Sequence, residues 1–187
     1  DLQADEITRG PARRQVKALY IVTAYPRDPD DVITPWLVEM ISRLRERGTG
    51  YPFVTLERAT GRVIGSTRYH AIEPAHRRLE IGYTFVAPAW QRSAVNTEAK
   101  YLMLRHAFEP LDQHRVEFKT DVLNERSRKA LLRIGATEEG VLRGHSITDD
   151  GRIRDTIYFS ILAPEWPAVK RRLEERLAAG PTAPGSA

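Results

Sequence analysis

Residues 79–100, LEIGYTFVAPAWQRSAVNTEAK, decide the fold of this 187-residue chain. Residues 78–86 predict a strand, which Pro88 ends. Residues 96–108 carry apolar side chains at helical spacing and predict a helix that Pro110 stops. A strand that leads directly into a helix places the free N–H groups of the first helical turn at the junction, beside the positive end of the helix dipole. The stretch therefore predicts an anion-binding turn over residues 91–97, with Arg92 as a fixed cation.

The composition around this stretch is that of one globular domain. Hydrophobic residues make up 41% of the chain and charged residues 29%, and cysteine is absent. No apolar run approaches the roughly 18 residues that span a bilayer, and the start of the chain shows no signal-peptide pattern. The net charge of +4 is scattered among acidic residues. We therefore expect a cytoplasmic protein with neither a membrane nor a nucleic acid as partner, and without disulfide or thiolate chemistry.

The periodicity of the remaining chain predicts an α+β (mixed α/β) domain, with a mostly antiparallel central sheet flanked by helices. Strands are expected over residues 52–57, 63–71, 78–86, 116–121, 140–147 and 154–161, with turns at 59–61 and 149–151. Helices are expected over residues 1–9, 34–48, 96–108, 124–135 and 164–177, while residues 12–20 form either a short helix or an irregular arm. We expect one domain over residues 1–178 and a disordered tail over 179–187.

Three blocks of sequence, in order and at fixed spacing, resemble the GCN5-related N-acetyltransferase (GNAT) superfamily. They are Val63-Ile64-Gly65-Ser66-Thr67-Arg68; Glu80-Ile81-Gly82-Tyr83 with the following residues 90–100; and Asn124-Glu125-Arg126-Ser127 through Ile134-Gly135-Ala136 and residues 139–143. The closest likeness is to the RimJ/RimL-type branch, whose members acetylate amino groups. The resemblance implies a GNAT-like sheet. The first strand of that fold is not evident. We expect it either to lie ahead of Asp1 or to be lacking because the N-terminal part of the chain diverges from the family.

The resemblance also implies acetyl-CoA as co-substrate and assigns residues to it. The pantetheine arm is expected to pair with the backbone of Phe85 and Val86, like an added strand. The pyrophosphate is expected on the following turn, which consists of Gln91, Arg92, Ser93, Ala94, Val95, Asn96 and Thr97. Asn124 is expected to cap a helix and to contact the pantetheine, with Ser127 beside it. Capping alone would also explain Asn124, and an exposed loop position would explain Arg92.

The phosphate turn departs from the family pattern at two positions, because Ala94 and Asn96 stand where glycine is usual. Glycine allows close approach of a ligand and a positive φ. Ala94 adds a single methyl group. Asn96 tolerates unusual backbone angles and could cap the helix.

Acetyl transfer to an amine requires a proton acceptor, a stabilised oxyanion and a leaving thiolate. Glu80, at the entry of the ligand-bearing strand, is the candidate general base; the alternative is a surface residue paired with Arg78 or Arg68. Ser127 is the candidate to protonate or hydrogen-bond the thiolate, and a simple helix-start role is the alternative. Leu131 stands where many family members have a tyrosine acid.

The sequence therefore predicts an acetyl-CoA-dependent N-acetyltransferase in which a primary amine attacks directly, with general-base assistance. The amine belongs to a protein N-terminus or to a small molecule. The alternative is a non-catalytic acyl-CoA-binding or sensing domain. No metal site is expected, because His70, His76, His106, His114 and His145 have no metal-ligand spacing. A homodimer formed through the hairpin at residues 140–161 and the C-terminal helix is a further expectation.

Overall fold

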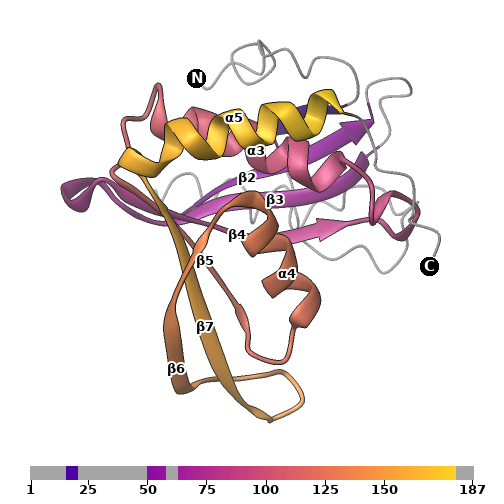
Figure 1. Cartoon of the computed structure of the whole chain (residues 1–187). Helices are drawn as coiled ribbons and strands as arrows, with labels where there is room; N and C mark the ends of the chain where they lie inside the picture. The colour runs from indigo at the N-terminus through magenta and orange to yellow at the C-terminus, as the bar shows by residue number, and fades with distance from the viewer. Residues whose placement is uncertain (1–15, 21–49, 58–62, 180–187) are drawn as a thin grey trace.

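One twisted sheet organises the part of the chain that the computed structural model describes, which is residues 16–20, 50–57 and 63–179 (Figure 1). The strands are β1 Val16–Tyr20, β2 Gly50–Glu57, β3 Val63–Glu73, β4 Arg78–Val86, β5 Arg115–Asp121, β6 Thr137–Ile147 and β7 Ile153–Leu162. The helices are α3 Val95–Phe108, α4 Glu125–Ile134 and α5 Trp166–Ala178, with short 3-10 turns η1 Pro74–His76, η2 Pro88–Trp90 and η3 Ala163–Glu165.

The seven strands follow the order β1-β2-β3-β4-β5-β7-β6. Neighbouring strands are antiparallel except for β4 and β5, which pair in parallel on either side of the crossover through α3. The predicted mixed α/β domain with a mostly antiparallel sheet is confirmed. The single parallel pair matters for function, because parallel strands joined by a helix place the helix N-terminus at the carboxyl end of the first strand.

The core lies between one face of the sheet and the helices. Leu79 and Ile81 of β4, Val116 and Phe118 of β5, and Ile157, Phe159 and Ile161 of β7 join the buried residues of α3, α4 and α5 in one cluster. Figure 1 shows α3 and α5 running side by side along this face. The Tyr69 hydroxyl donates to the Met103 carbonyl at 2.6 Å, and the Tyr101 hydroxyl donates to Glu174 at 2.7 Å. These bonds tie α3 to the sheet and to α5.

Residues 16–20 correct one expectation. They form neither a short helix nor an irregular arm but strand β1, which pairs antiparallel with β2 from Val16↔Glu57 to Tyr20↔Phe53. A strand that precedes β2 in sequence and pairs with it is therefore present within this chain. Five residues are too short to show a period, so the strand depends on the free edge of β2. The helices expected over 1–9 and 34–48, the turn at 59–61 and most of the expected tail lie outside the described residues.

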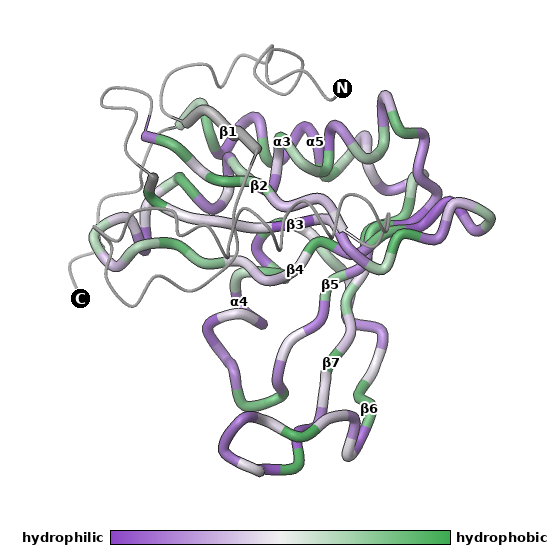
Figure 2. Tube along the Cα trace, turned by 180° about the vertical axis from the view of Figure 1, so that it is seen from behind, coloured by the Kyte–Doolittle hydropathy of each residue, from purple (hydrophilic) through white to green (hydrophobic). Residues whose placement is uncertain are grey.

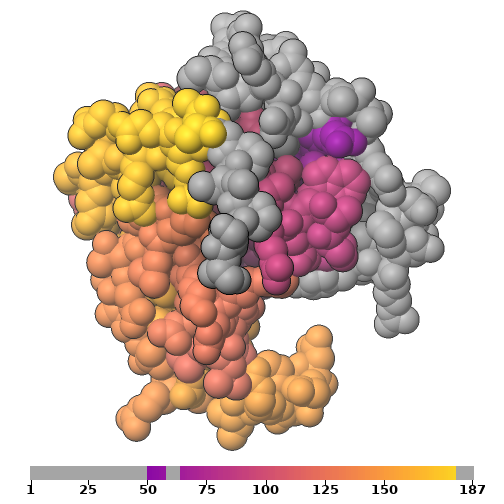
Figure 3. Space-filling view, turned by 45° about the vertical axis from the view of Figure 1, so that its right-hand side comes forward, coloured from indigo at the N-terminus to yellow at the C-terminus, as the bar shows by residue number. Residues whose placement is uncertain are grey.

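The β6–β7 hairpin projects from the body of the molecule (Figures 1 and 3). The large apolar side chains exposed on it are Val141, Leu142, Ile147 and Ile153. Figure 2 shows hydrophobic segments in this projecting part as well as around the helices. No helix in the described ranges has the length and apolar character needed to cross a membrane.

Candidate active site

The site is built around a fork in the sheet, which is the point where β4 and β5 stop pairing and separate. β4 and β5 pair only from Arg78↔Arg115 to Glu80↔Glu117, although β4 continues to Val86 and β5 to Asp121. Beyond Glu80 the two strands separate. A cavity of about 1050 Å³ lies at this fork and is lined by both strands and by the N-terminal turns of α3 and α4. The sheet thus exposes the inner edge of β4 where an extended ligand could pair with it.

A β-bulge shapes the wall of the fork on β4. Ser66 pairs with Phe85 and Arg68 with Gly82, so that Thr67 alone faces both Tyr83 and Thr84. Tyr83 is the extra residue of this bulge, and its backbone is left-handed, with φ of 52°. Such a bulge bends a strand and redirects its side chains. Here it turns Thr84 toward the cavity, which that residue helps to line.

The predicted anion-binding turn before α3 has a different backbone from the one that its sequence suggested. The positive φ falls on Arg92 (63°), whereas Ala94 is right-handed and serves as the N-cap of α3 without a side-chain bond. Asn96 is the second residue of the helix and does not cap it, which corrects that expectation. Its Oδ1 is buried with no partner among the described residues. Since neither position needs a positive φ, Ala94 and Asn96 are compatible with this turn.

Most of the predicted site residues gather around the one cavity. Those that line it are Glu80, Val86, Gln91, Arg92, Ser93, Ala94, Asn96, Thr97, Asn124 and Ser127. Phe85 and Val95 are not among the lining residues, and the Val95 side chain packs with Ile64 in a small separate cluster. The backbone N–H groups of Asn96 and Thr97 belong to the first turn of α3, which has no intrahelical partners for them.

Gln91 connects the two sides of the fork. Its Nε2 donates to the Val86 carbonyl at 3.0 Å, and its Oε1 accepts from Arg126 of α4 at 2.9 Å. The Val86 carbonyl is one of the groups that the resemblance assigned to the pantetheine. A ligand that donates to this carbonyl would either share it with the Gln91 amide or displace that amide, since a carbonyl oxygen has two lone pairs.

Asn124 begins α4 as predicted. Its Oδ1 accepts a hydrogen bond from the Ser127 N–H at 3.0 Å, and Gly135 ends the helix with φ of 97°. Ser127 is half-buried at the cavity wall, one turn ahead of the buried Leu131. The capping bond fixes the first turn of α4 and with it the position of the Ser127 hydroxyl.

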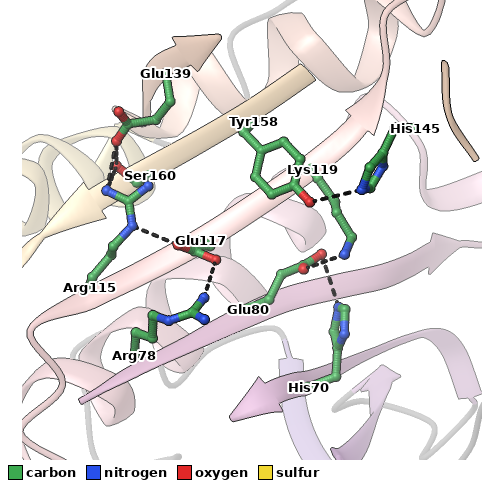
Figure 4. Close-up of polar contacts among 10 residues, drawn as sticks. All are labelled: His70, Arg78, Glu80, Arg115, Glu117, Lys119, Glu139, His145, Tyr158 and Ser160. Atoms are coloured by element: carbon green, nitrogen blue, oxygen red, sulfur yellow. Dashed lines mark hydrogen bonds and ion pairs between the residues drawn. The ribbon is translucent and has the colours of Figure 1, made fainter. Parts of the chain in front are cut away.

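Glu80 is a buried carboxylate and not a surface residue. Its side chain is 3% exposed, and it lies 3.0 Å from His70 Nε2 and 2.9 Å from Lys119 Nζ (Figure 4). The expected partners Arg78 and Arg68 are elsewhere, since Arg78 pairs with Glu117. Burial alone would raise the pKa of Glu80, but hydrogen bonds and opposite charge from His70 and Lys119 outweigh it and lower that pKa. The carboxylate is therefore ionised at neutral pH.

The Glu80 carboxylate lies on the face of the sheet that is turned away from α3. Its neighbours in sequence, Leu79 and Ile81, point into the core, and alternation along a strand sends Glu80 to the other face. Figure 4 shows two polar rows on this face. One runs His70, Glu80, Lys119, Tyr158, His145; the other runs Arg78, Glu117, Arg115, Ser160, Glu139. Only the first row reaches the fork, through Glu80 and Lys119.

Lys100 is a site residue that sequence reasoning missed. It lies on α3, is 4% exposed and lines the cavity, with its Nζ donating to Thr67 Oγ1 at 3.1 Å and to Thr84 Oγ1 at 2.5 Å. Burial lowers its pKa to about 7. The signal was present, because Lys100 stands one turn ahead of Leu104 on a helix that is buried almost throughout. A lysine on that face needs an explanation.

The remaining histidines do not form a metal site. His106 is buried on α3 and stacks on Tyr69, while His145 is exposed with its Nε2 3.5 Å from the Tyr158 hydroxyl. Among the residues placed by the structure, no group of three or more His, Asp or Glu side chains could hold a metal ion.

Comparisons with known proteins indicate a single family of relatives. Residues 4–137 match the family described as “Acetyltransferase (GNAT) domain”. A curated relative from Bacillus subtilis (strain 168), named “Putative ribosomal N-acetyltransferase YdaF”, is 34% identical over 110 residues, which is 59% of this chain and 59% of that relative's length.

Two solved structures extend the comparison to the fold. A GCN5-related N-acetyltransferase from Brucella melitensis is 33% identical with a TM-score of 0.70, covering 78% of this chain and 63% of that one. RimJ of Mycobacterium smegmatis, in complex with CoA-disulfide, is 28% identical with a TM-score of 0.65, covering 74% and 65%.

Proposed function

The chain belongs to the GNAT family of acetyltransferases, and from that premise we propose that it moves the acetyl group of acetyl-CoA to a primary amine. The observation that carries the proposal is the fork between β4 and β5. It opens beside the N-terminus of α3 and has the ionised Glu80 at its closed end. A polyanionic thioester and an amine could meet there.

The fork fits the co-substrate in shape and charge. A pantetheine arm can pair with a strand edge, and among the described residues the pairing of β4 with β5 ends at Glu80. Phosphates need N–H donors and cations, and the first turn of α3 and Arg92 supply both. Arg126 and Lys129 of α4 add positive charge to the same wall. The RimJ structure with a CoA derivative supports this reading for a related chain.

We assign the proton from the incoming amine to the Glu80 side of the fork. An ionised carboxylate attracts the ammonium form of an amine and accepts its proton, directly or through a water molecule. A lowered pKa makes Glu80 a weak base by itself, and His70 at 3.0 Å can share the proton. Ser127, on the α4 side, is assigned a hydrogen bond to the leaving sulfur. A backbone N–H near Val86 is the simplest donor to the oxyanion.

The acceptor is proposed to be an amine on a protein N-terminus, with a small-molecule amine as the alternative. The name of the Bacillus subtilis relative, a ribosomal N-acetyltransferase, supports a protein acceptor. The face that carries Glu80 also carries the second polar row, with Arg78, Arg115 and Glu139, which could orient a charged peptide segment.

A thiol-release assay with peptide and small-molecule amines tests the proposal, together with calorimetric binding of CoA. We expect turnover with at least one class of amine, reduced about 100-fold in Glu80→Gln. Glu174→Gln is the matched control, since Glu174 is also a partly buried, hydrogen-bonded carboxylate but does not line the cavity. Tight CoA binding without turnover of any amine, and no effect of Glu80→Gln, would instead identify a non-catalytic acyl-CoA-binding domain.

A further inference from the structure

Lys100 carries a positive charge into the interior without a counter-charge. Within the described ranges its Nζ contacts two threonine hydroxyls and no carboxylate. Burying an unpaired ammonium is unfavourable, and proteins keep such groups mostly where they act on a ligand. The structure therefore calls for a partner that arrives with the substrate.

The two hydroxyls place this ammonium at the bulge of β4. Thr67 Oγ1 lies 2.9 Å from Thr84 Oγ1 and donates to the Gly82 carbonyl at 3.2 Å. Lys100 thus closes a network that joins α3 to both strands at the point where β4 bends. Because Thr84 lines the cavity, this network forms part of the cavity wall and not only of the core.

Glu80 and Lys100 approach the fork from opposite faces of the sheet. Glu80 lies on the face away from α3, whereas Lys100 comes from α3 itself, on the face that α4 and Ser127 share. Several other ionised groups of the cavity have an opposite charge beside them. Lys119 pairs with Glu80, Asp121 with Arg152, and Glu125 with Lys129. Lys100 is a buried amine on the α3 side, and its Nζ has no such pairing among the described residues.

The order of residues along β4 locates the reacting end of the co-substrate, if the proposed function holds. The phosphate turn follows Val86, and the arm would run from there back toward Glu80. The thioester then falls beside Thr84 and Gly82, next to the Lys100 network. A serine hydroxyl is a far weaker acid than a thiol, so Ser127 can hydrogen-bond the departing sulfur but cannot readily protonate it. Leu131 offers no proton either.

We propose that Lys100 is the general acid of the reaction and gives its proton to the departing thiolate of the co-substrate. The amine nitrogen bonds to the acetyl carbon and loses its proton on the Glu80 side. The carbon–sulfur bond then breaks, sulfur takes the electron pair, and a proton passes from Lys100 Nζ to sulfur. The products are the amide and the free thiol, and Lys100 recovers a proton from solvent. A pKa of about 7 suits this exchange with a thiol.

The test compares two acetyl donors that differ in their leaving group. Acetyl-CoA releases an alkyl thiol that needs a proton, whereas an acetyl aryl thioester releases a much more acidic thiol that does not. In Lys100→Met we expect turnover of acetyl-CoA to fall about 100-fold, with less than about a threefold change in KM. With the aryl thioester the loss should be only a few-fold. Lys170→Met, a lysine of α5 that pairs with Glu109, is the control and should behave as wild type.

The turnover assay and one further measurement separate the outcomes. Equal losses with both donors would overturn the acid role of Lys100 while leaving the proposed function in place. Absence of turnover by the wild-type protein with every amine would overturn the proposed function and this inference with it. The pKa of Lys100, followed by ¹³C NMR of its side chain in the wild-type protein, should lie near neutrality; a value near the ordinary lysine pKa of 10.5 would contradict the inference. If Lys100→Met fails to fold, Lys100→Gln replaces it, because Gln keeps a donor to the threonines.

Discussion

At the scale of single residues, Lys100 should reduce stability while it serves catalysis. Its pKa is lower in the folded chain, so the unfolded chain binds more protons between about pH 7 and pH 10.5. The destabilising contribution is fully present below about pH 7 and disappears as the pH rises through this window. A shift from 10.5 to about 7 corresponds to at most about 5 kcal/mol. Replacing Lys100 removes this destabilising contribution, but it also removes the two hydrogen bonds to Thr67 and Thr84, so the net increase in stability will be smaller.

Lys100→Met is therefore expected to be more stable than wild type at neutral pH, by about 1–4 kcal/mol, and less active. Urea denaturation across the pH range from about 6 to 10 checks this. The difference between the two proteins should shrink as the pH rises. A variant that is less stable at every pH would show that Lys100 is a structural residue.

Glu80 should have the opposite pH dependence. Its pKa is lowered in the fold, so its contribution is present above the ordinary carboxyl value of 4.5 and is lost as the pH falls through the lowered pKa. Glu80→Gln leaves Lys119 without its counter-charge and His70 without its carboxylate partner, and it should cost about 1–3 kcal/mol at neutral pH, since Lys119 is partly exposed. As the pH is lowered, the free energy of unfolding should fall less steeply in the variant than in the wild-type protein. The same pH dependence in both proteins would contradict a lowered pKa for Glu80.

At the scale of elements, the start of α4 can be divided into its capping and binding roles. Asn124→Ala removes the side-chain acceptor for the Ser127 N–H and should lower stability by about 1 kcal/mol. Asn124→Asp keeps the cap but places a negative charge at the cavity. If Asn124 also contacts the co-substrate, both variants should weaken CoA binding, while only Asn124→Ala should unfold more easily. Equal CoA affinity in all three proteins would limit Asn124 to capping.

The turn before α3 should act on the phosphates and not on the pantetheine. Arg92→Ala is expected to weaken CoA binding about tenfold, and less at high salt, because an exposed cation acts through a screened charge interaction. Binding of pantetheine, which lacks the nucleotide phosphates, should change little. Calorimetry with both ligands makes the comparison. Equal effects on the two would show that Arg92 does not contact phosphate.

Most elements could be predicted from local patterns. The bounds of β4 and the cap and end of α4 are confirmed at the predicted residues, since Asn124 and Gly135 act within one turn of the chain. Strand β1 could not be predicted, because its five residues depend on a partner 33 positions away at the Tyr20↔Phe53 pair. The expected capping by Asn96 was wrong for a related reason: the helix began one residue earlier, at Val95.

At the scale of the whole molecule, binding of the co-substrate should stabilise the fold and close the fork. A ligand present at 100 times its Kd stabilises the native state by about 2.7 kcal/mol. Hydrogen exchange should slow along the inner edge of β4, the first turn of α3 and the start of α4 when CoA is added. The β6–β7 hairpin, which projects from the body, should exchange as before (Figure 1). Uniform protection or none would contradict binding at the fork.

The expected homodimer stays a prediction at this scale. Ile147 and Ile153, 74% and 69% exposed on the hairpin, are the apolar residues that such a contact would cover. Sedimentation of the wild-type protein would show whether two copies associate.

The sequence by itself determined the family and the order of most elements, including the turn between β4 and α3, because these depend on short-range periodicity, caps and spacing. It also predicted that Glu80, Asn124 and Ser127 belong to one site, and all three line the same cavity. Only the tertiary structure decided which charges meet. Pairing of β3, β4 and β5 buried Glu80 between His70 and Lys119, and packing of α3 under the bulge left Lys100 with two hydroxyls. Burial and partners come from residues distant in sequence, so the chemistry of these groups became visible only in the fold.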